Sequence, residues 1–221
     1  MILGLLLTLF HCNKPASEII LAGYDQGKRT MKLEYRVFNI KLDNGQRGKR
    51  METLVHYAIG NRISLKTERT AMLHEDFSLY QSQSTKEKNQ ETSSVTSQVE
   101  NNKILIDLTG PDGQVRQTTV DHKGPVFIEL LPMLYTKDLK NPGGEKSYPV
   151  LLEEEGRVAQ VKVRFVGPET FYENDKSQTG LHYQIQSLNN PAELQDIFVD
   201  AKTRGIMKIQ FGKMKFIPPP S

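Results

Sequence analysis

The five histidines are the first residues to consider for catalysis or metal binding. They are His11, His56, His74, His122 and His182. No two of them stand at the H-x-H or i, i+4 spacing by which one strand or one helix presents two imidazoles to a shared metal ion. The spacing therefore predicts ordinary strand and turn positions and no metal site.

The sequence also offers few groups for nucleophilic or cofactor chemistry. It contains no nucleophile elbow, no phosphate-binding glycine loop and no dinucleotide fingerprint. The adjacent carboxylates Glu153, Glu154 and Glu155 could attract a cation, but neighbouring side chains on a strand point to opposite faces, so we interpret them as a charged hairpin tip. A catalytic trio from distant positions stays open, because such groups meet in space. We expect no catalytic residue, no cofactor and no enzyme activity.

The single cysteine, Cys12, directly follows an apolar block. Residues 1–10 carry no charge, and a helix needs about 20 apolar residues to span a bilayer, so the block fits the apolar region of a secretory signal better. With Leu9 three residues before Cys12, the segment resembles the bacterial lipoprotein signal. That resemblance implies a signal over residues 1–11 and a lipid on Cys12. The alternative is a buried N-terminal strand with an incidental cysteine.

Charge and hydropathy exclude some classes of partner. The chain has 29 basic and 26 acidic residues, and the only basic doublets are Lys28-Arg29 and Lys49-Arg50. A nucleic-acid binder concentrates basic residues on one face with aromatic residues between them, so we expect no nucleic-acid partner. A hydrophobic content of 37% is compatible with a half-exposed sheet.

Alternating residues predict the main structural elements. Leu33, Tyr35 and Val37 alternate with charged residues, and a change of phase at Phe38 suggests a β-bulge. The following Asn44-Gly45 favours a tight hairpin turn, so a partner strand is expected over residues 50–59. About ten short strands follow this pattern, with Gly167-Pro168 ending one of them. The polar residues 81–94 are a loop or, as we prefer, strand ends around a solvated tip.

One segment departs from the alternation. Phe127, Leu130, Leu131 and Leu134 have helical spacing after Pro125, although Pro132 interrupts it. We expect a helix of about two turns. Its apolar stripe needs cover, so it should lie on the concave face of the sheet, and its four apolar residues are our candidate ligand-binding residues. The alternative is a helix that begins at Pro132 after a strand.

The fold class is therefore mainly β: a curved antiparallel meander sheet or half-barrel with one short helix on its concave face. We expect a tether over residues 12–29, a single β-rich domain over 30–217 and a tail over 218–221. The short run at residues 19–21 could instead pack on the domain. Residues 138–147 are expected to separate two halves of the sheet.

The order of these elements and the closing segment DIFVDAKTRGIMKIQF, residues 196–211, carry a resemblance. The chain resembles uncharacterised bacterial periplasmic β-rich proteins with the architecture of the outer-membrane lipoprotein carrier and its receptor. This resemblance implies a concave sheet that offers an apolar surface to acyl chains. It brings no catalytic motif.

Two functions follow as hypotheses. The first is a lipid-anchored binding module of the cell envelope, facing the periplasm from the inner or outer membrane, that holds an acyl chain or an apolar segment of a partner. The second is a structural or assembly lipoprotein of the envelope without a ligand. In both, the N-terminal lipid attaches the protein to the membrane.

Overall fold

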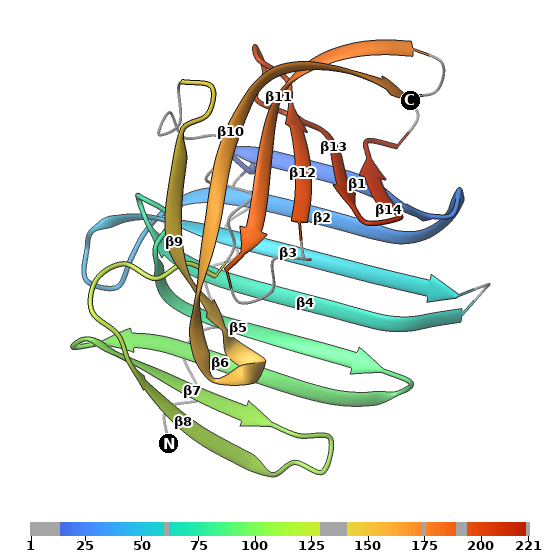
Figure 1. Ribbon diagram of the computed structural model, residues 1–221. Coiled ribbons are helices and arrows are strands. Elements are labelled where there is room, and N and C mark those ends of the chain that lie inside the picture. The colour runs from blue at the N-terminus through green and yellow to red at the C-terminus, as the bar shows by residue number, and fades with distance from the viewer. Residues whose placement is uncertain (1–13, 60–61, 129–140, 174–175, 189–193, 220–221) are drawn as a thin grey trace.

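The computed structural model describes residues 14–59, 62–128, 141–173, 176–188 and 194–219. Within them, one antiparallel sheet holds 14 strands in the order β8-β7-β6-β5-β4-β3-β2-β1-β14-β13-β12-β11-β10-β9 (Figure 1). Neighbours in this order are sequential except at one place, where β1 lies beside β14. The sheet therefore consists of two meanders joined through the first and last strands of the chain.

The first meander contains eight strands, most of them long. They are β1 (Ser17–Asp25), β2 (Lys28–Lys41), β3 (Arg47–Ile59), β4 (Arg62–His74), β5 (Leu79–Lys88), β6 (Glu91–Glu100), β7 (Lys103–Thr109) and β8 (Val115–Asp121). The predicted hairpin turns are confirmed: β2 and β3 flank Asn44-Gly45, and Asn89 and Gln90 turn the chain between β5 and β6 with positive φ. Residues 81–94 thus form strand ends around a tip.

The second meander contains the remaining six strands and the 3-10 turn η2. They are β9 (Glu145–Leu152), η2 (Glu153–Glu155), β10 (Arg157–Glu173), β11 (Lys176–Ser187), β12 (Leu194–Val199), β13 (Ile206–Phe211) and β14 (Met214–Ile217). Gly167-Pro168 does not end a strand as expected. β10 continues through it with a register shift, because Gly167 adopts φ +129° and the bulge absorbs the turn.

Residues 17–25 correct the expected tether. They form β1, which pairs with β2 on one side and with β14 on the other. The apolar run Ile19-Ile20-Leu21 is short, but it lies in the middle of this strand, and Leu21 is fully buried. A strand between two partner strands has its backbone N–H and C=O groups hydrogen-bonded on both sides. Because of this pairing, a few apolar residues are enough to hold it in the sheet.

The expected bulge at Phe38 is also wrong. The register between β2 and β3 runs without interruption from Met31 to Lys41. Val37 and Phe38 point to opposite faces, and both are buried. The guanidinium of Arg50 lies 4.3 Å from the centre of the Phe38 ring and covers the ring on the face opposite to the Val37 side chain. Two consecutive apolar residues, one buried on each face, therefore produced the apparent change of phase in the alternation of the sequence.

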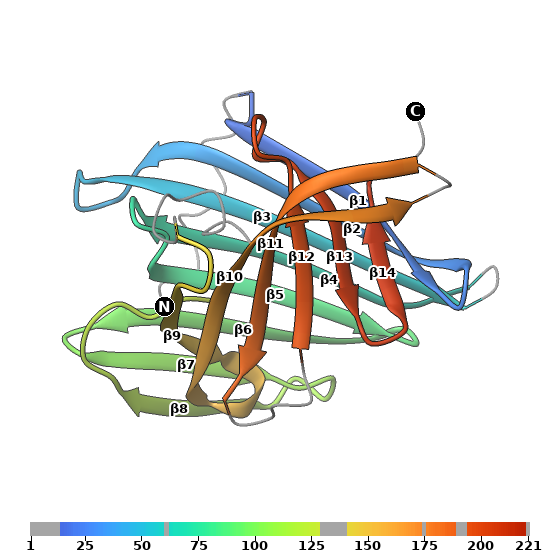
Figure 2. The ribbon, with the colours of Figure 1, turned by 45° about the horizontal axis from the view of Figure 1, so that its top comes forward.

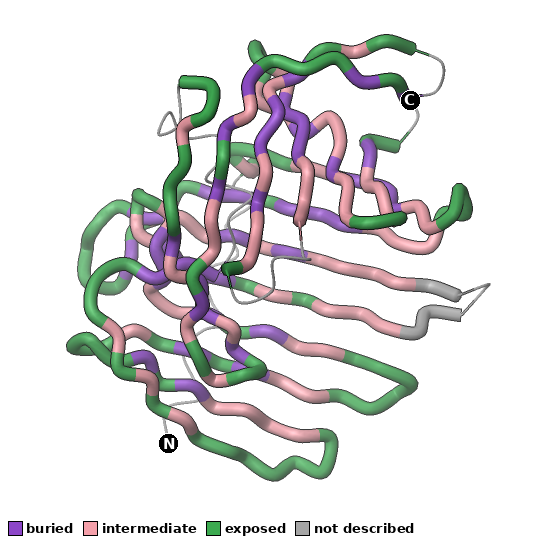
Figure 3. The backbone as a smooth tube through the Cα atoms, in the orientation of Figure 1, coloured by how far each residue is buried: buried purple, intermediate pink, exposed green. Residues whose placement is uncertain are grey.

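The second meander folds back across the first, so that β10, β11 and β12 cross over the strands of the first half in both views (Figures 1 and 2). The surface enclosed between them is the inner face. Buried residues gather in the middle of the strands, and exposed ones lie at the hairpin ends (Figure 3). Leu21, Met51 and Ile106 from one meander and Ile197 and Val199 from the other belong to the same core cluster.

The sequence predicted a mainly-β protein with a curved antiparallel sheet, and this fold class is confirmed. The sheet is open, with β8 and β9 as its edges, and it has 14 strands instead of about ten. The expected helix is not found in the part of it that the structure describes: Phe127 forms a bridge with Val150 beside β9. The remainder, residues 129–135, lies outside the described residues.

Candidate functional site

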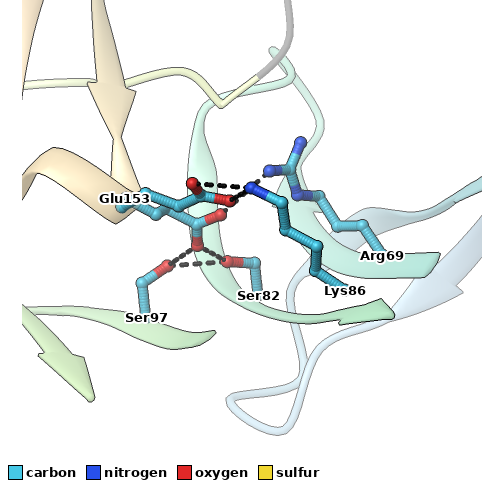
Figure 4. A network of polar contacts seen from close by, with 6 residues as sticks. Arg69, Ser82, Lys86, Ser97 and Glu153 are labelled. Atoms are coloured by element: carbon cyan, nitrogen blue, oxygen red, sulfur yellow. Dashed lines mark hydrogen bonds and ion pairs between the residues drawn. The ribbon is translucent and has the colours of Figure 1, made fainter. Parts of the chain in front are cut away.

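The most connected polar site of the described chain lies at the tip of the β9–β10 hairpin. There the 3-10 turn η2 places Glu153 against the inner faces of β4, β5 and β6 (Figure 4). Its side chain is only 2% exposed. We call Glu153 and its partners Arg69, Ser82 and Ser97 the inner clamp.

Three donors occupy the Glu153 carboxylate. Arg69 Nη2 lies 3.1 Å from Oε2, and Ser97 Oγ donates to Oε1 at 2.7 Å. Ser82 Oγ donates to the same Oε1, and the two serine oxygens lie 2.6 Å apart. Hydrogen bonds to a charged group are about twice as strong as neutral ones. The tip of the second meander is thereby fastened to three strands of the first.

The strand registers explain how these side chains meet. Ser82 on β5 lies directly opposite Ser97 on β6 and opposite Ala71 on β4. Side chains directly opposite each other share a face, and all three are small, so they leave room for an incoming carboxylate. Arg69 precedes Ala71 by two residues on β4 and therefore points to the same face. Local alternation thus builds the receiving surface, and the hairpin supplies the carboxylate.

The three consecutive glutamates separate into two environments. Glu154 pairs with Lys86 through both carboxylate oxygens, at 2.9 and 3.0 Å, and its side chain is 65% exposed. Glu155 contacts Arg157 and is 55% exposed. The interpretation as a charged hairpin tip fits these two residues but is wrong for Glu153. In the 3-10 turn Glu153 points inward, where a lone carboxylate would be costly, and Arg69 compensates its charge.

The inner clamp associates the two meanders. The buried Glu153 carboxylate accepts two hydrogen bonds at Oε1, from Ser82 and Ser97, and one at Oε2, from Arg69. None of its partners among the described residues is an imidazole that could activate Ser82 or Ser97. The clamp therefore closes the two meanders on each other.

A second polar cluster lies on the outer face of the second meander. His182 on β11 contacts two carboxylates, Nδ1 to Glu169 Oε2 at 2.5 Å and Nε2 to Asp196 Oδ1 at 2.8 Å. Gln184 Nε2 donates to the same oxygen of Asp196 at 3.1 Å. The His182 ring stacks on Phe198 with centroids 4.6 Å apart. This cluster links β10, β11 and β12 and leaves His182 only 7% exposed.

The far end of the β10–β11 hairpin curls over the same outer face. Phe171 and Phe198 have ring centroids 4.5 Å apart although β11 lies between their strands. At Gly180 on β11 a Cβ would be crowded, 3.2 Å from Met207 Sδ and 3.3 Å from the Val199 carbonyl oxygen. Glu173, 8% exposed, then reaches Lys215 at 2.6 Å. Both sets of contacts tie strands of the second meander together on this face.

The residues predicted as sites are placed only in part. Cys12, Leu130, Leu131 and Leu134 lie outside the described residues. Phe127 is 6% exposed and meets Tyr148 edge-on, with centroids 5.5 Å apart. The backbone N–H of Phe127 donates to Pro149 O at 2.9 Å, and its carbonyl accepts from Leu151 N–H at 2.7 Å. Phe127 is therefore a core residue fixed to the edge of β9.

Histidines and acidic residues do not combine into a metal site in the described ranges, where no group of three or more His, Cys, Asp or Glu side chains is suitable for an ion. His56 lies on β3 and His122 follows β8. His74 contacts the Tyr80 ring, with centroids 5.6 Å apart.

Asp200 shows why the closing segment turns where it does. Its carboxylate accepts hydrogen bonds from Thr203 N–H at 2.6 Å, Thr203 Oγ1 at 3.0 Å and Lys202 N–H at 2.9 Å. The Thr203 backbone and hydroxyl, followed by the Lys202 backbone, lower the pKa of Asp200 below its ordinary value. The turn over residues 200–205 thus serves as a structural cap between β12 and β13.

Comparisons with known proteins define the fold alone. No family model matches the chain, and no curated protein matches it. Among solved structures, it is similar to a β-barrel-like protein of domain of unknown function DUF1849 from Brucella abortus, with a TM-score of 0.53 and 8% identity over 91% of this chain and 94% of that chain. The likeness supports a β-rich fold that is shared with a protein of unknown function. In the described residues, no helix has the length and hydropathy to cross a membrane.

Proposed function

We propose that the protein is a non-catalytic, lipid-anchored module of the cell envelope that docks or spaces other components, with the interior of its sheet filled by its own strands. The observation that carries this proposal is the burial of the inner face. Met51, Ala71 and Ile104 in the first meander and Ile197 and Val199 in the second are 0% exposed. These side chains belong to one contiguous core.

The filled core favours the assembly hypothesis over the carrier hypothesis. A carrier for an acyl chain needs an apolar lining that its ligand covers. Here the apolar side chains of both meanders form one buried cluster with residues 126–128 of the segment between them, and the inner clamp fastens the two meanders together at Glu153.

The anchor in this proposal is Cys12. Only residues 13–16 separate Cys12 from β1, which begins at Ser17. At no more than about 3.6 Å per residue, the step from Cys12 to Ser17 spans at most roughly 18 Å. A lipid on Cys12 would therefore hold the β1–β2 region close to the membrane surface, as a docking module requires.

Replacing Cys12 by serine is expected to abolish fatty-acid incorporation. Cells are grown with an alkyne-tagged fatty acid, and the purified protein is examined for the tag before and after substitution. Several acyl chains hold a protein stably on a membrane, whereas one chain binds only marginally, so the label should accompany the membrane fraction. An equal label on wild type and Cys12→Ser, or none on either, contradicts the anchor.

The carrier alternative makes a different prediction. It requires an internal space for an acyl chain, and so it requires lipid that stays with the protein in the absence of detergent. The assembly proposal requires no such lipid. The two hypotheses therefore differ in the amount of lipid that stays with the protein, and this amount does not depend on the lipid anchor at Cys12.

A further inference from the structure

The two edges of the open sheet are built differently, and the β9 edge is protected. The Phe127 backbone pairs with Pro149 O and Leu151 N on the free side of β9. Pro149 itself has no N–H to offer. Proline and a covering segment are devices by which natural sheets prevent pairing with another chain.

The β8 edge carries none of these devices. β8 pairs with β7 over all its residues without a register shift, and it contains neither proline nor glycine. Within the described residues, no strand pairs with its other side. Val115, the first residue of β8, is 56% exposed, one of the most exposed large apolar side chains of the described chain.

The backbone phase of β8 shows which groups are free to pair. Gly110 N–H donates to Gln114 O, and His122 N–H donates to Asn102 O, both at 2.9 Å. In an antiparallel ladder the bonded pairs recur every second residue, so the even-numbered residues of β8 direct their N–H and C=O groups toward β7. The odd-numbered residues, Gln117, Thr119 and Asp121 among them, direct theirs outward.

We propose that this edge pairs with β8 of a second copy of the chain, antiparallel and about a twofold axis at Thr119. A twofold axis perpendicular to the sheet keeps the same face up in both copies, so residues of equal parity lie opposite each other. Thr119 then exchanges both backbone hydrogen bonds with Thr119 of the second copy. Gln117 lies opposite Asp121 of that copy, and the reverse pair repeats across the axis.

The side chains in this register are complementary. The Gln117 amide faces the Asp121 carboxylate, which accepts its hydrogen bond. On the inner face, Thr118 lies opposite Val120, a pair of β-branched residues that suits a sheet. Val115 comes opposite Lys123, whose methylene stem covers apolar surface while its ammonium stays in water. Arg116 comes opposite His122, and no two residues of like formal charge lie directly opposite each other in this register.

Two measurements on the full chain in density-matched detergent test this pairing. Sedimentation equilibrium should show a mass that rises with concentration from one to two chains of 25.1 kDa. Hydrogen exchange resolved to single amides should then protect Gln117, Thr119 and Asp121 only at high concentration. The amides of Arg116, Thr118 and Val120 should be protected at every concentration, since they bond to β7.

A matched pair of variants locates the interface. Thr119→Lys places two ammonium groups opposite each other at the axis and should keep the chain monomeric. Thr96→Lys adds the same charge at an exposed position of β6, a strand that has neighbours on both sides, and should dimerise like the wild type. A wild type that stays monomeric, a dimer unaffected by Thr119→Lys, or odd-numbered amides that exchange equally in both states would overturn the proposal. None of these outcomes bears on the anchor or the filled core.

Discussion

Glu153→Ala is expected to lower the free energy of unfolding by about 3 kcal/mol, at the lower end of the range for breaking a buried ion pair because the Arg69 side chain is 25% exposed. The substitution leaves the guanidinium without its charge partner and removes the acceptor of the Ser82 and Ser97 hydroxyls. Urea denaturation should show a lower midpoint with an unchanged slope.

Glu154→Ala is the matched control for this prediction. It removes the neighbouring carboxylate, whose pair with Lys86 is exposed and therefore contributes no more than about 1 kcal/mol. Equal losses in the two variants would mean that Glu153 is no more than another surface charge. The inner clamp would then not fasten the meanders together.

Phe127→Ala is expected to destabilise the fold by about 3 to 5 kcal/mol, because it removes a buried ring and leaves a cavity. The substitution abolishes the edge-on contact of Phe127 with Tyr148 and removes an aromatic side chain from the core cluster. Thermal unfolding followed by circular dichroism should show a markedly lower midpoint. Tyr172→Ala, at a side chain 76% exposed, should change the stability by no more than about 0.5 kcal/mol.

This variant also separates a core residue from a ligand contact. A side chain that served only to hold a bound acyl chain would leave the stability of the ligand-free protein nearly unchanged when truncated. A normal melting temperature for Phe127→Ala would therefore contradict the core position of the ring and revive the carrier hypothesis.

Hairpin chemistry made much of the fold predictable. Gly45 supplies the positive φ that the turn needs, and the alternation on either side of Asn44-Gly45 defines two strands and their shared buried face. The turn at Asp200 was predictable from another local signal, because a short acidic side chain can accept hydrogen bonds from the backbone of the turn that it opens. Local signals of this kind led to the curved antiparallel sheet.

Signals that are not local could not be read in the same way. β1 consists of few apolar residues and is a strand because β2 and β14 flank it, and β14 lies at the far end of the chain. The phase change at Phe38 reflects burial on both faces, which depends on Arg50 covering the ring from the next strand. Tertiary neighbours decided both cases.

The inner clamp was hidden for a related reason. Glu153 is separated from Ser82 by 71 residues and from Arg69 by 84, and its two acidic neighbours are exposed. Three consecutive glutamates are typical of a solvated hairpin tip, so the sequence did not distinguish Glu153 from its neighbours. A signal was present in Ser82 and Ser97, which occupy inward positions of alternating strands where apolar residues are usual. Buried hydroxyls on one face require a polar partner, and the fold-back of the second meander supplies it.

The content of the interior tests the central claim most directly. Residues 13–221, which contain the whole sheet, are produced without detergent, extracted with organic solvent and analysed for lipid by mass spectrometry. We expect no lipid at a level comparable to the protein, because the apolar side chains of both meanders form one buried cluster with residues 126–128. A fatty acid or phospholipid recovered in amounts equimolar with the chain would show that the two meanders enclose a ligand, and it would contradict the filled interior.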